Sequence, residues 1–173
     1  MRIAVALFEG AEELDWAGPW EVLSAWANQW PDDGVEVFTV AETREPVTSA
    51  KGLRALADTT WDEIGDVDVL VYPGGRGTRA QLGDDRIRAR LRALAAGGTL
   101  MTSVCTGSLD LLGELGAVEV RPDARFVDTG EVVTAAGVSA GIDMALHLVA
   151  RLHSPERARE VRRYIQYDPE PPV

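Results

Sequence analysis

Short apolar runs alternate with amphipathic helical patterns along the first two thirds of the chain. Four runs have the length and composition of buried strands, at residues 2–8, 35–40, 67–72 and 99–104. Two stretches between them, at about 19–30 and 84–96, place apolar residues at helical spacing. Strands that alternate with helices are typical of a parallel sheet covered by helices. The pattern therefore predicts an α/β fold.

The rest of the chain predicts shorter elements. We expect a small hairpin over 46–60, two strands over 125–128 and 132–135, a helix from Ser139 to about Leu152, and another helix from Pro155. Asp84 is placed to cap the helix at 84–96, which Gly97 ends. A chain of 173 residues without repeats or a low-complexity linker is expected to form a single domain over residues 1–173.

Composition narrows the possible partners and the compartment. The formal net charge is −11, and no Lys/Arg-rich stretch stands apart from the acidic residues, so nucleic acid is not expected as a partner. The apolar N-terminal run at 2–8 is too short to cross a membrane and is interpreted as a core strand. One cysteine cannot form an internal disulfide, which agrees with a reducing compartment. These features predict a cytoplasmic protein.

The single cysteine, Cys105, lies where the strand at 99–104 gives way to Thr106-Gly107-Ser108 and a leucine-rich helical pattern. A strand that turns sharply into a helix presents the turn residue at the end of the sheet, and the helix N-terminus favours thiolate over thiol. The alternative is a buried free cysteine that acts as a small hydrophobic residue. The strand, turn and helix context favours a nucleophile.

Ligands of open parallel sheets bind beyond the carboxyl ends of the strands, where three chemistry-bearing segments fall. Acidic residues including Asp15 follow the first strand, a glycine-rich segment at 73–77 follows the third, and Cys105 follows the fourth. If these strands are neighbours, the amides of Gly75 and Thr106 can hold developing negative charge near the thiol. The alternatives are a simple tight turn for the glycines and a solvated loop for the acids. Trp16, beside Asp15, is a candidate pocket wall.

A second motif, Gly-Val-Ser-Ala-Gly at 137–141, matches the pattern of a serine-hydrolase elbow. The two histidines, His147 and His153, fall on the same predicted helix as Ser139 and are carried away from it along the helix axis. We therefore interpret Ser139 as a helix N-cap. No His, Cys and Asp residues have metal-ligand spacing, so neither a metal nor another cofactor is predicted.

With these residues in place, the chain resembles the ThiJ/PfpI superfamily, also called class I glutamine-amidotransferase-like, and within it the isonitrile hydratase branch. The stretches that carry the resemblance are 10–15 with 18–19, 72–75, 103–108, 136–143 and 167–172. The resemblance implies a flavodoxin-like three-layer sandwich with a mostly parallel sheet and a cysteine nucleophile elbow. It also implies a small-molecule substrate and a homodimer. Thr106 stands where protease-like members have histidine, which argues against peptidase activity.

The sequence departs from this branch after Ser108. Similar proteins continue with a turn, a short strand bearing Thr-Thr-His-Trp, and another helix, whereas here Ser108 runs directly into the leucine-rich segment that begins at Leu109. A strand, about one helix and the histidine of that motif are therefore missing from this stretch.

The leading hypothesis is hydration of an isonitrile to an N-formamide by a carbon–nitrogen lyase. The Cys105 thiolate attacks the terminal isonitrile carbon, and Asp15, kept protonated by burial, delivers a proton and then positions water. The Gly75 and Thr106 amides orient the thioimidate intermediate. One alternative is a non-catalytic sensor or ligand-binding module with an oxidisable Cys105. Another is glyoxalase or deglycase-like activity.

Overall fold

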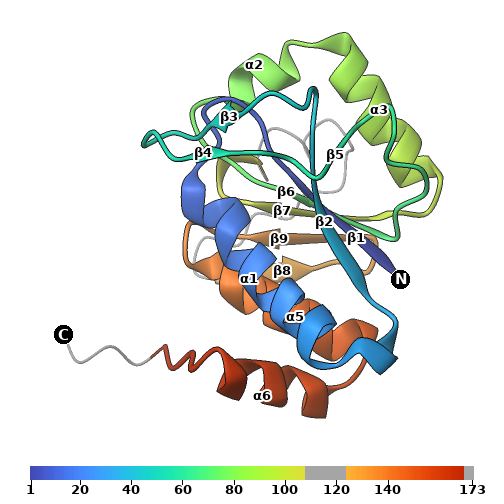
Figure 1. Cartoon of the computed structure of the whole chain (residues 1–173), viewed down its shortest axis with the longest axis vertical. Helices are drawn as coiled ribbons and strands as arrows, with labels where there is room; N and C mark the ends of the chain where they lie inside the picture. Colours follow the sequence, from blue (N-terminus) through green and yellow to red (C-terminus); the bar gives the residue numbers. More distant parts are fainter. Residues whose placement is uncertain (108–123, 170–173) are drawn as a thin grey trace.

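A mostly parallel sheet forms the middle layer of the computed structural model, which describes residues 1–107 and 124–169 (Figure 1). In this part of the chain the sheet has seven strands, in the order β5 (Thr59–Thr60), β2 (Glu36–Ala41), β1 (Arg2–Ala6), β6 (Val69–Tyr72), β7 (Leu100–Val104), β9 (Val132–Ala135) and β8 (Phe126–Asp128). Neighbouring strands are parallel except β8 and β9, which pair antiparallel. The central strands β1 and β6 are almost entirely apolar and β7 adds the small buried residues Thr102 and Ser103, because both faces of these strands are buried.

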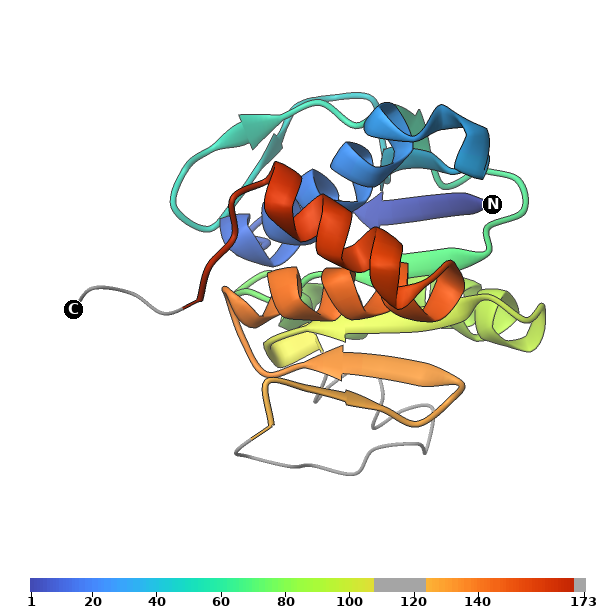
Figure 2. The ribbon, with the colours of Figure 1, turned by 90° about the horizontal axis from the view of Figure 1, so that it is seen from below.

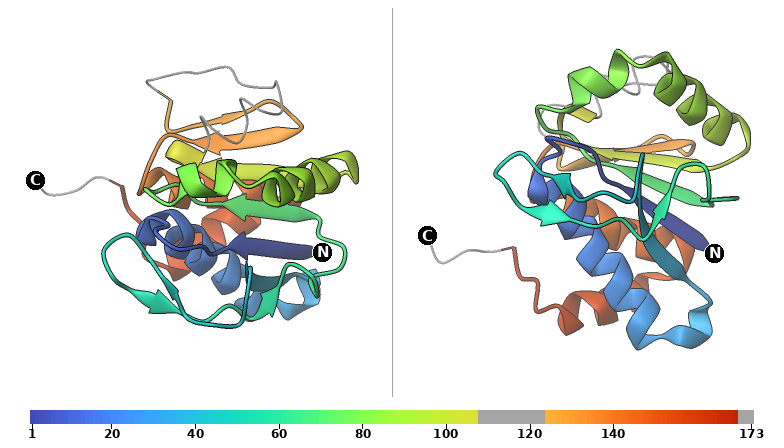
Figure 3. Two further views of the ribbon diagram at one scale, coloured as in Figure 1. Left: turned by 90° about the horizontal axis from the view of Figure 1, so that it is seen from above. Right: turned by 45° about the horizontal axis from the view of Figure 1, so that its top comes forward.

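Helices cover both faces of this sheet (Figures 2 and 3). One face carries α1 (Glu13–Gln29), α5 (Ala140–Leu152) and α6 (Pro155–Tyr164), and the other carries α2 (Thr78–Leu82) and α3 (Asp85–Ala96). A 3₁₀ turn, η1 (Pro31–Asp33), follows α1, and a separate antiparallel hairpin consists of β3 (Val47–Thr48) and β4 (Arg54–Ala55). The α/β, three-layer fold expected from the sequence is confirmed.

Small residues let α1 and α5 approach each other and the sheet closely. A Cβ on Gly18 of α1 would lie 3.0 Å from Ile142 of α5, and one on Gly141 would lie 3.1 Å from Pro19 and 3.2 Å from Val104 of β7. These approaches leave little room for a larger side chain at either glycine. The end of β7, which leads to Cys105, is thereby packed directly against the two helices.

The register of the central strands brings their carboxyl ends to one edge. Val5 of β1 lies opposite Val71 of β6, and Tyr72 of β6 lies opposite Ser103 of β7. The first, third and fourth predicted strands, which are β1, β6 and β7, are therefore neighbours. The segments that follow these strands, including Cys105, consequently lie at the same edge of the sheet.

Most elements predicted from the sequence are present, with one boundary wrong. The predicted hairpin, the strands over 125–128 and 132–135, and the helices ending at Ala96 and Leu152 are confirmed, and Asp84 caps α3 by accepting a hydrogen bond from the Arg86 amide at 2.9 Å. The helix predicted over 19–30 begins at Glu13 instead. Pro19 lies inside it and removes one helical hydrogen bond, but the buried face on α5 continues across it.

Three short elements among the described residues, η1, α2 and β5, were not predicted, because a single helical turn or two strand residues carry no periodicity. The leucine-rich pattern after Cys105 and the departure after Ser108 lie outside the described residues. No helix in the described parts of the chain combines the length and apolar character needed to cross a membrane.

We expect Gly77→Ala to lower the free energy of unfolding by roughly 1–3 kcal/mol, because backbone must move to admit the methyl group. A Cβ on Gly77 would lie 1.9 Å from the carbonyl oxygen of Glu9. Urea unfolding followed by tryptophan fluorescence measures the change. Gly83→Ala is the matched control, since its nearest atoms lie at an ordinary 3.5 Å. Equal stability of the two variants would contradict the close packing of the Gly77 backbone against Glu9.

Candidate active site at Cys105

Cys105 occupies a turn between β7 and a helical turn at residues 106–107. Its φ angle is +61°, a left-handed conformation that is uncommon for a residue with a side chain. The amide of Cys105 donates a hydrogen bond to the Ala135 carbonyl at the end of β9 at 3.0 Å, which holds the turn to the neighbouring strand. The side chain is half-buried. The backbone thus has the strand, strained turn and helix start that the sequence predicts.

The glycine-rich segment at 73–77 packs against this turn at distances that exclude side chains. A Cβ on Gly74 would lie 2.8 Å from the amide nitrogen of Thr106, and one on Gly107 would lie 2.7 Å from the Pro73 carbonyl oxygen. Gly75 has a φ of +114°, and its Cβ would lie 2.4 Å from the amide nitrogen of Glu12. The glycines therefore do more than form a tight turn, because they bring three segments of backbone into contact.

Asp15 lies in the first turn of α1, fully buried beneath these segments. Its Oδ2 accepts a hydrogen bond from the Gly74 amide at 3.0 Å. Its Oδ1 is buried without a hydrogen-bond partner of normal geometry among the described residues, although the Val138 amide and the Cys105 thiol are near enough to lower its pKa. Burial is the dominant influence and, with the nearby charge of Glu12, raises the pKa of Asp15 to about 6.

Glu12 and Glu13, which flank this position, have a different environment. The Lys51 ammonium pairs with Glu12 and lies 3.8 Å from Oε2 of Glu13, while the Lys51 amide donates to Oε1 of Glu13 at 2.6 Å. Burial opposes ionisation of Glu13, but hydrogen bonds from backbone amides and the Lys51 charge lower its pKa below the usual value. Both residues are tied to the β3–β4 hairpin. Asp15 is therefore the acid suited to hold a proton near neutral pH.

The amides of Gly75 and Thr106, both predicted to hold negative charge, differ in whether they already donate a hydrogen bond within the described residues. The Gly75 amide donates to Oγ1 of Thr106 at 3.0 Å, so it is already engaged. The Thr106 amide has no acceptor among the described residues, and the Thr106 hydroxyl accepts from Gly75 while donating to none of them. A bound ligand can therefore receive hydrogen bonds from the amide and hydroxyl of Thr106, with Gly75 orienting that hydroxyl.

A cavity of about 580 Å³ opens at this edge of the sheet, large enough for a small organic molecule. It is lined by Glu12, Gly75, Arg76, Thr78, Arg79, Cys105, Thr106 and Val138. Trp16, the candidate pocket wall, is not among the lining residues, because its buried indole packs toward the hairpin and donates to the Ser49 hydroxyl at 3.1 Å. Sequence reasoning missed Arg76 and Arg79, because no pattern in the sequence marks either arginine as a cavity residue.

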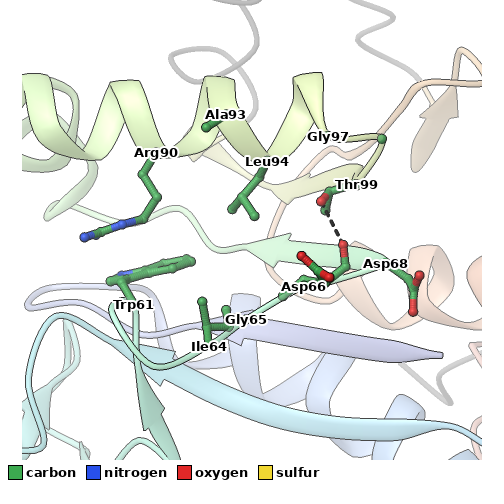
Figure 4. A pocket seen from close by; sticks show the side chains of 12 residues that line it. Trp61, Ile64, Gly65, Asp66, Asp68, Arg90, Ala93, Leu94, Gly97 and Thr99 are labelled. Carbon is green, nitrogen blue, oxygen red and sulfur yellow. Dashed lines mark hydrogen bonds between the residues drawn. The ribbon is translucent and has the colours of Figure 1, made fainter.

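A second cavity, of about 500 Å³, lies at the opposite edge of the sheet, where β6 and β7 begin (Figure 4). Trp61 and Leu94 line it, with the Arg90 guanidinium 5.3 Å from the centre of the Trp61 ring. The Thr99 hydroxyl at its rim already donates to the Val67 carbonyl at 2.7 Å. No thiol lines this cavity, so the cavity at Cys105 is the candidate site for reactions that need a nucleophile.

The serine-elbow motif at 137–141 does not form a hydrolytic site. Ser139 occupies the N-cap position of α5, as predicted, but its hydroxyl accepts from Arg125 at 3.2 Å and makes no capping hydrogen bond to the helix. His147 contacts Asp128 at 2.7 Å, and His153 lies 3.3 Å from Asp33. Both histidines of the chain are thus engaged elsewhere, and neither lines the Cys105 cavity. In the described residues no group of acidic, His or Cys side chains is arranged to hold a metal.

Comparison with known proteins places these features in a family. The model of the DJ-1/PfpI family matches residues 1–122. An isonitrile hydratase of Pseudomonas putida is 34% identical over 99% of this chain and 81% of that protein, and DJ-1alpha of Drosophila melanogaster is 26% identical over 92% and 81%. The crystal structure of a ThiJ/PfpI family protein from Pseudomonas syringae superposes with a TM-score of 0.88 at 30% identity, covering 99% of this chain and 77% of that one. The chain belongs to the DJ-1/PfpI family, which confirms the resemblance seen in the sequence.

The raised pKa of Asp15 predicts a pH-dependent advantage for Asp15→Asn. Because the folded protein favours protonated Asp15, the wild type loses stability as pH rises from the unfolded pKa near 3.8 to the folded pKa of about 6. The asparagine can still accept from Gly74 but carries no charge. The variant should gain roughly 2 kcal/mol of unfolding free energy relative to the wild type between about pH 4.5 and pH 7.5.

Urea unfolding at the two pH values measures this gain, with Asp66→Asn, at an exposed position, as the control. A difference between Asp15→Asn and the wild type that stays constant with pH would show that Asp15 has an ordinary pKa.

Proposed function

We propose that this protein hydrates small isonitriles to N-formamides. The observation that carries the proposal is the buried Asp15 carboxyl group, whose pKa is raised, near the thiol of Cys105, which itself lines a cavity of about 580 Å³. An acid whose pKa lies within about one unit of neutrality, and which can therefore both give up and take back a proton, suits a substrate whose carbon must be protonated as the nucleophile attacks. The 34% identity to an isonitrile hydratase over nearly the whole chain supports the same reaction.

The first proposed step forms a thioimidate. The Cys105 thiolate donates an electron pair to the terminal isonitrile carbon and forms an S–C bond, one N–C π pair moves to nitrogen, and the lone pair on the carbon is left to take a proton. Asp15 supplies that proton from its carboxyl group and becomes a carboxylate. The product of the step is R–N=CH–S–Cys, in which every atom of the isonitrile is retained.

The second proposed step consumes water. The Asp15 carboxylate accepts a proton from a water molecule, whose oxygen adds to the thioimidate carbon. Collapse of the resulting adduct breaks the S–C bond and returns the thiolate, while the hydroxyl proton of the adduct is transferred to nitrogen and gives R–NH–CHO. The Thr106 amide and hydroxyl donate hydrogen bonds to the intermediate, with Gly75 holding the hydroxyl in place. The sum is isonitrile plus water to formamide, so neither oxidant nor cofactor is needed.

We further propose that the chain is a single domain that lacks the strand–helix unit expected after Ser108. The alignment with the Pseudomonas putida relative extends over 192 positions, whereas this chain has 173 residues. At least 19 positions of that relative therefore have no counterpart here. A gap of this size is comparable to one short strand and a helix of average length.

A homodimer in the cytoplasm, with a small molecule as the substrate, completes the proposal. Leu53 and Leu56 of the hairpin region expose 51% and 67% of their surface, and Trp20 of α1 exposes 38%. A subunit interface would bury such side chains.

The second candidate is a redox-sensing module, favoured by the same thiol in a cavity with two arginines. In this reading the thiolate takes oxygen from peroxide in two steps, each releasing the reduced oxygen as water, to give a sulfinate. One structural relative, DJ-1 of Toxoplasma gondii, was solved in an oxidised form, with a TM-score of 0.82 at 22% identity. Glyoxalase-like activity, the name of a 25% identical relative from Caenorhabditis elegans, is less well supported because no histidine lines the cavity.

Replacement of the thiol tests the hydratase directly. We expect Cys105→Ala to reduce formamide production from a simple alkyl isonitrile to the uncatalysed rate, because no nucleophile remains. Ser139→Ala is the matched control, since its hydroxyl lies outside the cavity lining, and it should retain wild-type turnover. Formamide is quantified by chromatography, with circular dichroism to verify folding. Turnover by folded Cys105→Ala would refute the mechanism.

Mild peroxide distinguishes the sensor from the enzyme. If Cys105 is a sensor, mass spectrometry of the wild type should show the addition of two oxygen atoms on the peptide containing Cys105 at low peroxide excess. We expect slow and unselective oxidation instead, comparable to that of the methionines. Rapid, selective conversion to sulfinate together with no isonitrile turnover would favour the sensor.

A further inference from the structure

Two arginines at the mouth of the Cys105 cavity have no ion-pair partner in the described residues. Arg76 and Arg79 line the cavity, and both are exposed. In a chain with a net charge of −11, most other described arginines contact a carboxylate, as Arg157 does with Asp33 and Arg125 with Asp143. Two unpaired guanidinium groups at one cavity are therefore unusual for this protein.

The backbone that carries these arginines is fixed. Arg76 lies between Gly75 and Gly77, and its Cγ would be 3.2 Å from a Cβ on Gly10. The Thr78 hydroxyl donates to the Gly75 carbonyl at 2.8 Å, and Thr78 is 1% exposed. These contacts fix the backbone of both arginines, Arg76 just before α2 and Arg79 within it, at the rim that also carries Gly75.

The acidic groups nearby do not cancel this charge. Glu12 is the carboxylate that lines the cavity, and its charge is met by the Lys51 ammonium. Asp15 is fully buried and is not among the residues that line the cavity, and its ionised form adds one negative charge against the two guanidinium groups. The cavity edge therefore presents an excess of positive charge on donors suited to planar oxyanions.

We propose that the cavity selects isonitriles bearing a carboxylate, with Arg76 and Arg79 binding that group while the isonitrile carbon reaches Cys105. This inference deepens the proposed hydratase function and rests on it for the identity of the reacting group. The positive rim itself depends only on the two arginines. Guanidinium groups bind a carboxylate through paired hydrogen bonds, which also orient the rest of the molecule.

The first test compares ω-isocyano carboxylates of two to five carbons with their methyl esters. The wild type should show a kcat/KM about tenfold higher for one of the acids than for its ester, and the preference should weaken as salt is added. Arg76→Gln/Arg79→Gln should bring the ratio of acid to ester close to one. Arg163→Gln, an exposed arginine on α6, should leave the ratio unchanged. An equal ratio in the wild type and the double variant would overturn the inference.

The second test needs no turnover. Cys105 is the single cysteine, so the rates of its alkylation by anionic iodoacetate and neutral iodoacetamide can be compared in the intact protein. Both reagents react with the thiolate, so the fraction of Cys105 that is ionised cancels when one alkylation rate is divided by the other. We expect the ratio of iodoacetate to iodoacetamide to fall about fivefold to tenfold in the double variant.

The two tests separate the two failures. A fall in the alkylation ratio without turnover of any isonitrile would leave the anion site standing and refute the hydratase. Turnover of isonitriles with no change in either ratio would keep the hydratase and overturn the anion site.

Discussion

The hydrogen bond from the Gly74 amide to the buried carboxyl of Asp15 connects the three segments on which the site depends. Asp15 belongs to α1, Gly74 to the segment after β6, and Gly74 in turn packs against the Thr106 amide beside Cys105. A carboxyl group enclosed in this way cannot be solvated, and one hydrogen bond to Oδ2 does not replace water. The folded protein therefore favours the protonated acid, and the same packing that joins the segments sets the chemistry of the site.

The sheet supplies the precision that this arrangement requires. Parallel pairing of β6, β7 and β9 aligns their carboxyl ends, and the amide of Cys105 is held by the Ala135 carbonyl of β9. A positive φ at Cys105 is sustained because this hydrogen bond and the packing of Gly74 against the Thr106 amide hold the turn on both sides. Gly18 and Gly141 allow α1 and α5 to pack close to the end of β7. Residues far from the cavity thus determine where the thiol lies.

Much of the fold and part of the site could be predicted from residue patterns alone. Apolar runs identified the central strands, and the positions of Asp15, Gly75, Cys105 and Thr106 after these strands indicated that they would meet, as they do. Such predictions succeed because parallel topology places every strand's carboxyl end at one edge.

Other features depend on three-dimensional contacts that no local pattern encodes. The start of α1 at Glu13 depends on packing that continues across Pro19. The engagement of the Gly75 amide by the Thr106 hydroxyl and the placement of the Trp16 indole against Ser49 are contacts between distant segments. Arg76 and Arg79 became recognisable as cavity residues only once the cavity itself was located.

Titration of Asp15 by ¹³C NMR measures the pKa on which the proposed proton transfer beside Cys105 depends. The protein would be labelled at the aspartate carboxyl carbon, and the Asp15 signal assigned by its absence in Asp15→Asn. We expect this signal to titrate with a pKa of about 6 in the folded wild type. A pKa near the ordinary 3.8 would leave almost none of the Asp15 carboxyl protonated at neutral pH, which would contradict its role as the proton donor beside Cys105.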